Sequence, residues 1–348
     1  MSANTMTANT MNVPKVKFGS RVSRRQVILI ILLLMVVAFT AIREPGFLSA
    51  NNAINIALQT SQIGLMACGM TYVMVAGGID LSVGSVLALG AAVAGVMLGM
   101  GLPVFVAIGL AIIAGVAVGA INGYGIAYLN IPPLILTLGV LYAVRGGILL
   151  ANAENPGGST IATGFDESFL AIGQTSLVGV PVPAVITILG FIIAHVVLTR
   201  MRFGRYTTAV GTDLAISRRA GIGVNRHLVK VYAVSGALAA VSGVLLTAQV
   251  NAASTNVGQG IELTVIAAVV IGGTALTGGV GSITGTLLGV LFLSVAQNAL
   301  DILNVSPFAF QLAVGVLLLI SAASDVFGNP DFWRKSSFLR GTTKKDRT

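Results

Sequence analysis

The stretch VAGGIDLSVGSV, residues 75–86, places one carboxylate and a pair of glycines between two long apolar runs. The run before it begins near residue 52, and the run after it ends near residue 100. About 20 apolar residues in a helix are enough to cross a hydrocarbon core that is about 30 Å thick. The stretch therefore predicts the end of one membrane-spanning helix, a turn that contains Asp80, and the start of the next helix.

The composition of the whole chain is that of a membrane protein. Hydrophobic residues make up 55% and charged residues 9% of the 348 residues, and the mean hydropathy is +0.94, whereas a soluble domain is about 25% charged. Glycines interrupt the apolar sequence at several boundaries, so counts between about eight and eleven spans stay open. We expect an all-α polytopic membrane protein with about ten transmembrane helices, near residues 26–42, 52–76, 82–100, 103–128, 132–151, 181–200, 229–250, 260–275, 283–300 and 307–325.

Basic residues predict the orientation of these spans. Of the 20 Lys and Arg residues, five precede or begin the first span, seven lie between residues 200 and 230, and six follow the last span. Cytoplasmic loops are enriched in Lys and Arg, whereas the segment 152–180 has acidic residues and neither Lys nor Arg, so it should face the outside. We expect three cytoplasmic segments around a transmembrane domain at 26–328, namely a basic N-terminal segment 1–25, a loop 201–228 within that domain and a basic tail 329–348.

The remaining reactive side chains give no sign of a catalytic or metal site. Cys68 lies inside an apolar span, and His195 and His227 have no carboxylate or cysteine neighbours at ligand spacing. The net charge of +9 reflects the basic loops and does not predict a nucleic-acid partner. We also expect the first span to stay uncleaved, because the run from Val27 to Ile42 is long for a signal peptide and no small-residue cleavage site follows it.

Glycine is the other informative residue type, with 43 copies. Most lie within spans at helical spacing, where small residues let helix backbones approach closely in lipid. Two clusters differ, because they combine glycine pairs with a break in the apolar sequence: AGGIDLSVGS at 76–85 and IGGTALTGGVGS at 271–282. Their similar shape predicts an internal repeat. Broken helices in matching halves are typical of transporters, in which they expose backbone groups to a solvated path.

Asp80 has two interpretations on the sequence. Its carboxylate is placed to accept the free backbone N–H of Ser82 or Val83 at the start of a helix, and it is also placed to contact a solute, because polar groups inside membranes often mark pathways. For each pathway candidate the alternative is a helix cap or an interhelical hydrogen bond, and Arg145 has the further alternative of pairing with Glu154 or Asp166. The candidates for the substrate pathway are Asp80, Ser82, Asn122, Arg145, Glu262 and Asn298.

Four motifs carry a family resemblance, which covers about residues 50–325. They are GMTYVMVAGGIDLSVGS (69–85), INGYGIAYLNIPPLILTLG (121–139), FGRYTTAVGTDLAISRRAGI (203–222) and GQGIELTVIAAVVIGGTALTGGVGSITGTLLG (258–289). In this order and spacing they resemble the permease subunits of ribose-type carbohydrate ABC importers. The resemblance implies a multi-pass protein of the bacterial cytoplasmic (inner) membrane that moves a monosaccharide or a related small polyol. It also implies a second permease subunit, a pair of cytoplasmic ATPase subunits and an extracytoplasmic sugar-binding protein.

The source of energy follows from what the chain lacks. No G-x-x-x-x-G-K-[ST] loop occurs in the sequence, so this chain cannot bind ATP phosphates in that way. We therefore expect a non-catalytic subunit that binds no cofactor itself and whose ATPase partner uses ATP and Mg²⁺. The alternative is an ion-coupled secondary carrier, which usually needs intramembrane carboxylates or a broken-helix cation site. Few ionisable residues lie in or near the spans, which weakens that alternative.

The cytoplasmic loop contains a predicted coupling helix. TDLAISRRAG, residues 212–221, reads as a short helix with a capping residue at its start, two arginines near its end and a glycine that stops it. Such a short helix needs a partner to pack against, and a groove of the ATPase would provide one. The alternative is a loop that only determines topology. The residues predicted to couple this chain to the ATPase are Thr212, Asp213, Leu214, Ile216, Arg218, Arg219 and Gly221.

Overall fold

The computed structural model describes residues 24–154 and 158–327. The predicted basic tail, and all but the last two residues of the predicted N-terminal segment, lie outside this part of the chain. Within it the fold is mostly helical. In chain order the elements are α1 (Arg24–Arg43), η1 (Pro45–Leu48), α2 (Ala50–Val75), α3 (Val83–Gly99), α4 (Val104–Tyr128), α5 (Pro133–Ala151), β1 (Thr160–Thr163), α6 (Glu167–Gln174), β2 (Ser176–Leu177), β3 (Val180–Pro181), α7 (Val182–Arg200), α8 (Arg202–Thr212), α9 (Leu214–Arg219), α10 (Val224–Val250), β4 (Ala252–Ser254), α11 (Ile261–Ile271), α12 (Ile283–Ile302) and α13 (Pro307–Phe327).

The apolar segments of the sequence form the long helices. Ten of the described helices coincide with the ten predicted spans to within about five residues at each end. Six of them, α1, α4, α5, α7, α10 and α12, are long and apolar enough to cross a membrane. The apolar helices α3 and α11 and the apolar part of α13 are shorter. The prediction of a mostly helical, polytopic membrane protein is therefore confirmed.

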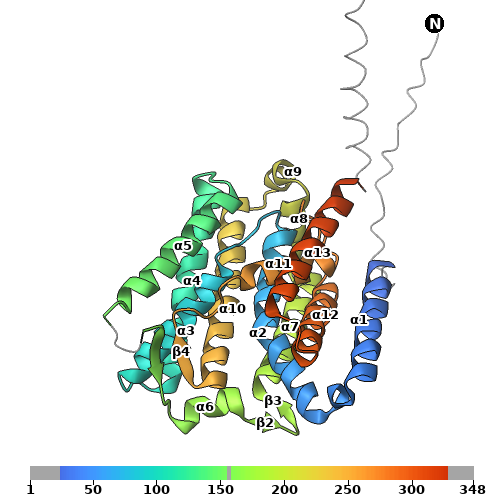
Figure 1. The fold of residues 1–348 in the computed structure, drawn as a ribbon. Coiled ribbons are helices and arrows are strands. Elements are labelled where there is room, and N and C mark those ends of the chain that lie inside the picture. The colour runs from blue at the N-terminus through green and yellow to red at the C-terminus, as the bar shows by residue number, and fades with distance from the viewer. Residues whose placement is uncertain (1–23, 155–157, 328–348) are drawn as a thin grey trace, which may run out of the picture.

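Helix α10 lies at the centre of the fold, between α3 and α4 on one side and α2 on the other (Figure 1). Glycines bring these helices into backbone contact. An added Cβ atom on Gly115, Gly119 or Gly123 of α4 would overlap backbone or side-chain atoms of α10, including the carbonyl oxygen of Tyr232. Such close approach replaces the hydrophobic effect, which does not drive helices together in lipid.

The connecting segments gather at two opposite ends of the molecule. Helices α8 and α9 lie at the same end as the start of α1 and the end of α13 (Figure 1). Helix α6 and the short antiparallel pair of β2 with β3 lie at the other end (Figure 1). A second antiparallel pair, β1 with β4, ties the segment after α5 to the segment after α10. The basic loop and the acidic loop of the sequence are thus separated by the length of the helices.

The two glycine-rich clusters form turns that touch each other. One turn, 76–82, links α2 to α3, and the other, 272–282, links α11 to α12. Both use a glycine with φ +86°, Gly77 in the first and Gly278 in the second, a backbone conformation that L side chains rarely adopt. The close packing of these two glycines leaves no room for a side chain, since a Cβ atom on Gly278 would lie 2.7 Å from the Cα atom of Gly77.

Candidate functional site

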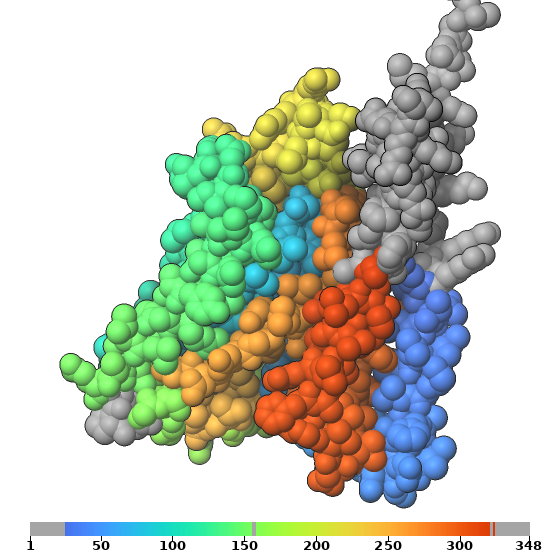
Figure 2. Space-filling view, turned by 45° about the horizontal axis from the view of Figure 1, so that its top comes forward, coloured from blue at the N-terminus to red at the C-terminus, as the bar shows by residue number. Residues whose placement is uncertain are grey.

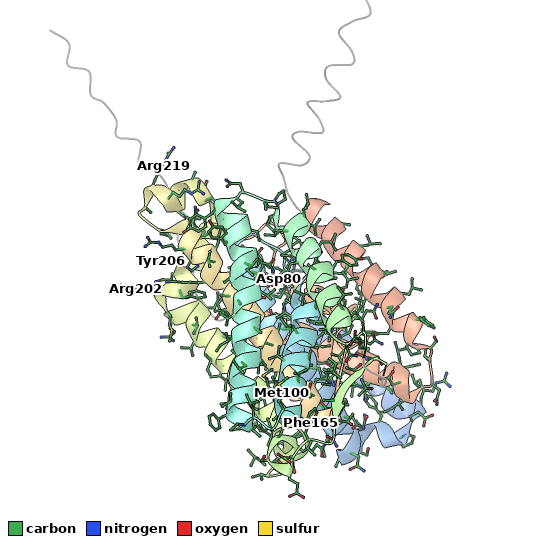
Figure 3. All side chains as sticks on the ribbon, turned by 90° about the vertical axis from the view of Figure 1, so that its left-hand side faces the viewer. Asp80, Met100, Phe165, Arg202, Tyr206 and Arg219 are labelled. Carbon is green, nitrogen blue, oxygen red and sulfur yellow. The ribbon has the colours of Figure 1, made fainter. Side chains whose placement is uncertain are left out.

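The first part of the candidate site is a buried carboxylate at the turn between α2 and α3. Oδ1 of Asp80 accepts hydrogen bonds from the backbone N–H of Ser82 at 3.0 Å and from the Ser82 hydroxyl at 2.6 Å. Oδ2 accepts one from the hydroxyl of Ser235 on α10 at 2.9 Å. Asp80 is only 1% exposed, and Figure 3 shows it inside the helix bundle.

Neighbouring side chains extend this network to α4 and α5. The amide of Asn122 on α4 donates to the Ser82 hydroxyl at 2.8 Å. The Thr137 hydroxyl on α5 accepts from the backbone N–H of Leu81 at 3.1 Å. The Tyr232 hydroxyl on α10 donates to the carbonyl oxygen of Ile79 at 3.3 Å. Three helices, α4, α5 and α10, therefore hold the turn through hydrogen bonds.

This geometry shows what three of the predicted pathway residues do. The expected bond from the Ser82 backbone N–H to Asp80 is present, so the carboxylate stabilises the turn that starts α3. Asp80, Ser82 and Asn122 come together, and each is at most 1% exposed. A buried carboxylate with three hydrogen-bond donors is stabilised by them and gives the turn one defined shape. Oδ1 of Asn122 has no hydrogen-bond partner among the described residues.

Arg145 and Glu262 lie apart from this network, and both approach Gly84 at the start of α3. The Arg145 guanidinium donates to the carbonyl oxygens of Thr255 at 2.7 Å and Val257 at 2.8 Å. The Glu262 carboxylate lies against Gly84, in the space that a Cβ atom on that glycine would occupy. Both side chains thus hold the segment between β4 and α11 against α3.

The alternative pairing of Arg145 with Glu154 or Asp166 is not present among the described residues. The nearest acceptors of the guanidinium are main-chain carbonyl oxygens, which the chain brings close where β4 ends. A guanidinium has five N–H donors in a fixed plane, so two adjacent carbonyl oxygens bind it well. Sequence reasoning missed this arrangement because every residue carries a carbonyl and no residue type marks the ones that are free.

Asn298 lies away from the other pathway candidates. Its side-chain amide pairs reciprocally with that of Asn52 in the first turn of α2, with two N···O distances of 2.9 Å. Asn52 also donates to the carbonyl oxygen of Phe47 at 2.8 Å. Because both amides are buried and paired, Asn298 joins α12 to α2. None of the six predicted pathway residues lines the cavities described below.

A cavity lined by glutamines was not predicted. It has a volume of about 440 Å³ and lies between α2, the start of α11, α12 and α13. Glutamines make up five of its lining residues, and the sequence has only eight in total. One sequence pattern could have indicated this cavity. Gln59 and Gln62 are three residues apart, which places both on one face of an otherwise apolar helix. The five are Gln59, Gln62, Gln259, Gln297 and Gln311.

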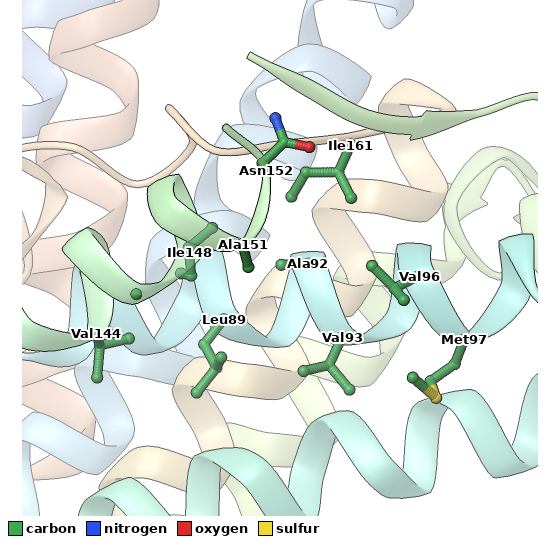
Figure 4. Close-up of a pocket in the computed structure, with 11 residues that line it drawn as sticks. Leu89, Ala92, Val93, Val96, Met97, Val144, Ile148, Ala151, Asn152 and Ile161 are labelled. Carbon is green, nitrogen blue, oxygen red and sulfur yellow. The ribbon is translucent and has the colours of Figure 1, made fainter. Parts of the chain in front are cut away.

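A second cavity contrasts with the glutamine cavity because its lining is apolar. It lies between α3 and α5 and has a volume of about 570 Å³. Figure 4 shows its side chains, among which Leu89, Val93 and Met97 of α3 face Val144 and Ile148 of α5. Asn152 supplies the polar side chain of this lining. Such a surface suits an acyl chain or another apolar helix and offers little to a hydroxyl-rich solute.

The predicted coupling helix forms as α9. Oδ1 of Asp213 accepts the backbone N–H of Ile216 at 2.8 Å, so Asp213 caps the helix. The Thr212 hydroxyl instead donates to the carbonyl oxygen of Thr208 within α8. Gly221 has φ +79° two residues after the last helical residue, consistent with its expected role in ending the helix.

Helix α9 presents apolar and basic side chains at the end of the molecule. Leu214 is 47% and Ile216 is 64% exposed. The Arg218 guanidinium has one long contact, 3.5 Å, with Asn225, and Figure 3 shows Arg219 pointing away from the bundle. The exposed apolar residues and arginines together form a surface suited to docking on a partner.

Helix α8 connects this surface to the two glycine-rich turns. A Cβ atom on Gly211, near the end of α8, would overlap the carbonyl oxygen of Val75 and lie 2.7 Å from the backbone nitrogen of Gly279. Beneath α9 is a cavity of about 270 Å³, whose lining includes Leu214 and Arg218 of α9 and Gly78 of the first turn. Helix α8 therefore contacts the turn that Asp80 holds, and α9 lines a cavity together with that turn.

Comparison with known proteins gives one family. The family model described as "Branched-chain amino acid transport system / permease component" matches residues 52–322. The ribose import permease protein RbsC of Haemophilus influenzae is 37% identical over 298 residues, which are 85% of this chain and 91% of that protein. The Bacillus subtilis RbsC is 40% identical over 84% of this chain and 90% of its own length. The L-arabinose transport system permease protein AraH of Escherichia coli is 33% identical over 82% of this chain and 85% of its own. No solved structure matches the chain.

Proposed function

Since this chain belongs to the family of transport-system permease components, we propose that it forms the membrane path of an ATP-driven importer for a monosaccharide or a related small polyol. The observation that carries the proposal is the similarity, over more than four-fifths of the chain, to permeases named for ribose and L-arabinose. A further relative is named as a probable ABC transporter permease. The family description mentions branched-chain amino acids, but the individual relatives favour a sugar.

An importer of this kind needs subunits that this chain does not supply. The sequence contains no G-x-x-x-x-G-K-[ST] loop, so we assign ATP and Mg²⁺ to a pair of partner ATPase subunits. An extracytoplasmic binding protein would deliver the solute. A second permease subunit, identical or related, would complete the path near a two-fold axis.

We propose that ten helices cross the bilayer, namely α1 to α5, α7 and α10 to α13. Their arrangement supports a cytoplasmic end that carries α8, α9 and both ends of the described chain (Figure 1). The segment with α6 would then lie outside the bacterial cytoplasmic membrane. The transmembrane domain is 26–328 in this proposal, with basic cytoplasmic segments before and after it. We further propose that the turns 76–82 and 272–282 are matching elements of an internal repeat.

The contacts of α8 and α9 support a mechanism of coupling. In our proposal, α9 sits in a groove of the ATPase, with Leu214 and Ile216 as apolar anchors and the two arginines beside them facing an acidic rim. Movement of α9 is passed to α8, because the two helices are joined at Asp213. Gly211 of α8 then moves the turns that it contacts. ATP-driven closure of the ATPase pair would in this way reorient the helices around the path.

The network around Asp80 fits this mechanism. Its hydrogen bonds to Ser82 and Ser235 fix the turn to α10, so displacement of the turn would move α3 and α10 together. We propose that Asp80, Ser82 and Asn122 act by positioning this turn, and that Arg145 and Glu262 act by holding the segment before α11. Asn298 acts by joining α12 to α2. In this proposal the six residues shape the path without facing it.

Uptake in cells tests the proposed function. A bacterial strain that lacks its own ribose and arabinose permeases would produce this chain together with the ATPase and binding protein encoded with it. We expect uptake of radiolabelled D-ribose or L-arabinose that depends on this chain, and we expect no uptake of L-leucine. Uptake of L-leucine without uptake of either sugar would overturn the choice of a sugar as the solute.

A further inference from the structure

We infer that the glutamine cavity between α2, α11, α12 and α13 is a binding site for a neutral, hydroxyl-rich solute, in the half of the bilayer that lies away from α8 and α9. This inference rests on the proposed import function and adds to it the place where the solute is recognised. The cavity volume of about 440 Å³ is within the range of about 300–1,000 Å³ that is usual for small-molecule sites.

The lining has the chemistry that a sugar needs. An amide side chain both donates and accepts hydrogen bonds, as does a hydroxyl group, so each of the five glutamines is able to bind a hydroxyl in either orientation. Thr264 adds a hydroxyl, and Ile63, Phe310 and Val314 offer apolar surface for the C–H faces of a ring. Polar groups fix the orientation of a bound ligand, and apolar surface contributes most of its burial.

The charges of the lining argue against an amino acid. Of the described residues that line the cavity, none is charged. An amino acid carries an ammonium and a carboxylate group, each of which needs an oppositely charged or strongly hydrogen-bonding partner when it leaves water. A neutral polyol has no such requirement, so this lining favours the sugar.

Two of the glutamine side chains have polar atoms without a short hydrogen bond among the described residues. Oε1 of Gln59 is buried and has no hydrogen-bond partner among the described residues. Nε2 of Gln62 has one long contact, 3.4 Å, with Oε1 of Gln249. A buried polar atom without a partner is destabilising, because it has lost its hydrogen bonds to water. A hydroxyl that enters the cavity would supply the missing partner.

The exposure of two glutamines indicates that this face of the chain borders a solvated path. Gln259 and Gln311 are exposed on the surface of the chain, next to apolar residues of α13 such as Leu312. Figure 2 shows the face on which α13 (red) and the segment before α11 (orange) lie side by side. Exposed amides in contact with lipid would lose their hydrogen bonds to water. The amides of Gln259 and Gln311 keep their hydrogen bonds to water if this face borders a solvated path next to the second permease subunit.

The position of the cavity fits delivery from outside. Gln297 is adjacent in the chain to Asn298, which pairs with Asn52 in the first turn of α2. That turn follows η1, at the end of the bundle opposite α8 and α9 (Figure 1). The cavity is therefore placed to receive a solute before the turns near Asp80 move.

The decisive variants are Gln62→Met, Gln297→Met and Gln311→Met, because methionine keeps the length of the side chain and removes the amide. In cells that contain the complete importer, we expect the initial rate of D-ribose or L-arabinose uptake to fall about fivefold for each variant, as loss of one hydrogen bond predicts. The amount of assembled complex should not change. Gln174→Met, at an exposed position of α6 outside the cavity, is the matched control and should keep the wild-type rate.

Two failures are distinguishable in this experiment. If the wild-type importer takes up neither sugar, the proposed function fails. If it takes up a sugar and all three variants transport as fast as Gln174→Met, the glutamine site is overturned.

Thiol labelling gives a readout that does not depend on the transport rate. The one native cysteine, Cys68, is fully buried, so a cysteine introduced by Gln62→Cys or Gln311→Cys is the accessible thiol of the described chain. In the assembled importer, we expect D-ribose to slow the reaction of these thiols with a small hydrophilic methanethiosulfonate reagent at least threefold. D-ribose should not change the labelling of Gln174→Cys. Equal labelling of all three variants with and without D-ribose would overturn the inference.

Discussion

The backbone N–H of Gly279 donates a hydrogen bond to the carbonyl oxygen of Val75 at 2.9 Å. This bond joins the last residue of α2 to the turn before α12, although the two are far apart in the sequence. Gly211 of α8 packs over the same bond without room for a Cβ atom. Helix α8, which lies beside the proposed ATPase-docking surface, is thus in close contact with both glycine-rich turns.

Substitution of Gly211 tests this connection. A Cβ atom at this position overlaps the carbonyl oxygen of Val75, so Gly211→Ala forces α8 away from the turns. We expect a loss of stability of about 1–3 kcal/mol, as for other overpacked positions, seen as a lower midpoint of thermal unfolding in detergent, and a loss of uptake. Gly109→Ala on α4 is the matched control, because nothing lies within 4 Å of its added Cβ atom. Equal behaviour of the two variants would contradict the contact.

Two substitutions of Asp80 separate its charge from its hydrogen bonds. Asp80→Ala leaves the Ser82 N–H and the Ser235 hydroxyl without their acceptor, at about 1–3 kcal/mol for each buried group. We expect a clear loss of thermal stability and of uptake. Asp80→Asn keeps one oxygen acceptor, and we expect it to retain more of both. Asp301→Asn, at an exposed position, is the control and should match the wild type. Wild-type stability of Asp80→Ala would show that the network does not hold the turn.

Charge reversal on α9 tests docking on the ATPase. We expect the double variant Arg218→Glu, Arg219→Glu to insert normally, because five other basic residues remain between 200 and 230, and to co-purify with less ATPase and transport less. Electrostatic docking also predicts that added salt weakens the wild-type association. Reversal of Arg202, at the start of α8, is the control. ATPase association at the wild-type level in the double variant would reject electrostatic docking.

The apolar anchors of α9 need a separate variant. Leu214→Asp with Ile216→Asp changes side chains that are 47% and 64% exposed, so the isolated chain should keep its thermal stability. We expect uptake to fall strongly, because charged groups would enter an apolar groove of the partner. If uptake is normal when these substitutions are added to the arginine reversals, α9 is not the coupling helix.

The Asn52–Asn298 pair predicts an energetic coupling between α2 and α12. Each single change to leucine leaves the other buried amide without its partner, whereas the double change removes both polar groups. We expect each single variant to lose about 1–3 kcal/mol of stability and the double variant to lose less than the sum. A double-mutant cycle on the thermal stability of the detergent-solubilised chain measures this coupling. Additive losses would show that the two amides act independently.

The sequence predicted the helices well for a simple physical reason. In a membrane, the length of an apolar run and the location of glycine and proline determine where a helix begins and ends. The predicted span 132–151 is therefore observed as Pro133–Ala151, and the short helix predicted within 212–221 is observed as Leu214–Arg219. Helix α6 and the short strand pairs were not predicted, because they depend on contacts between distant segments such as β1 and β4.

The candidate site was harder to predict, because its residues act through their neighbours. Asp80 and Asn122 stand out in apolar sequence, and the structure brings them together around Ser82. Arg145 was predicted to line the pathway, with pairing to Glu154 or Asp166 as the alternative, and it binds carbonyl oxygens of the segment before α11. The five glutamines of the cavity come from three helices and the segment before α11. Apart from the spacing of Gln59 and Gln62, no short motif identifies them. Their convergence depends on how α2, α12 and α13 pack.

The central claim is that ATP hydrolysis by a partner drives a sugar through this chain. The most direct measurement uses proteoliposomes that contain the chain and its ATPase, with the sugar-loaded binding protein on the extracytoplasmic side and ATP with Mg²⁺ on the other. We predict that radiolabelled D-ribose or L-arabinose crosses the membrane only when ATP is hydrolysed, and that ionophores which collapse proton and sodium gradients do not change the rate. Uptake driven by an ion gradient without ATP would contradict the account.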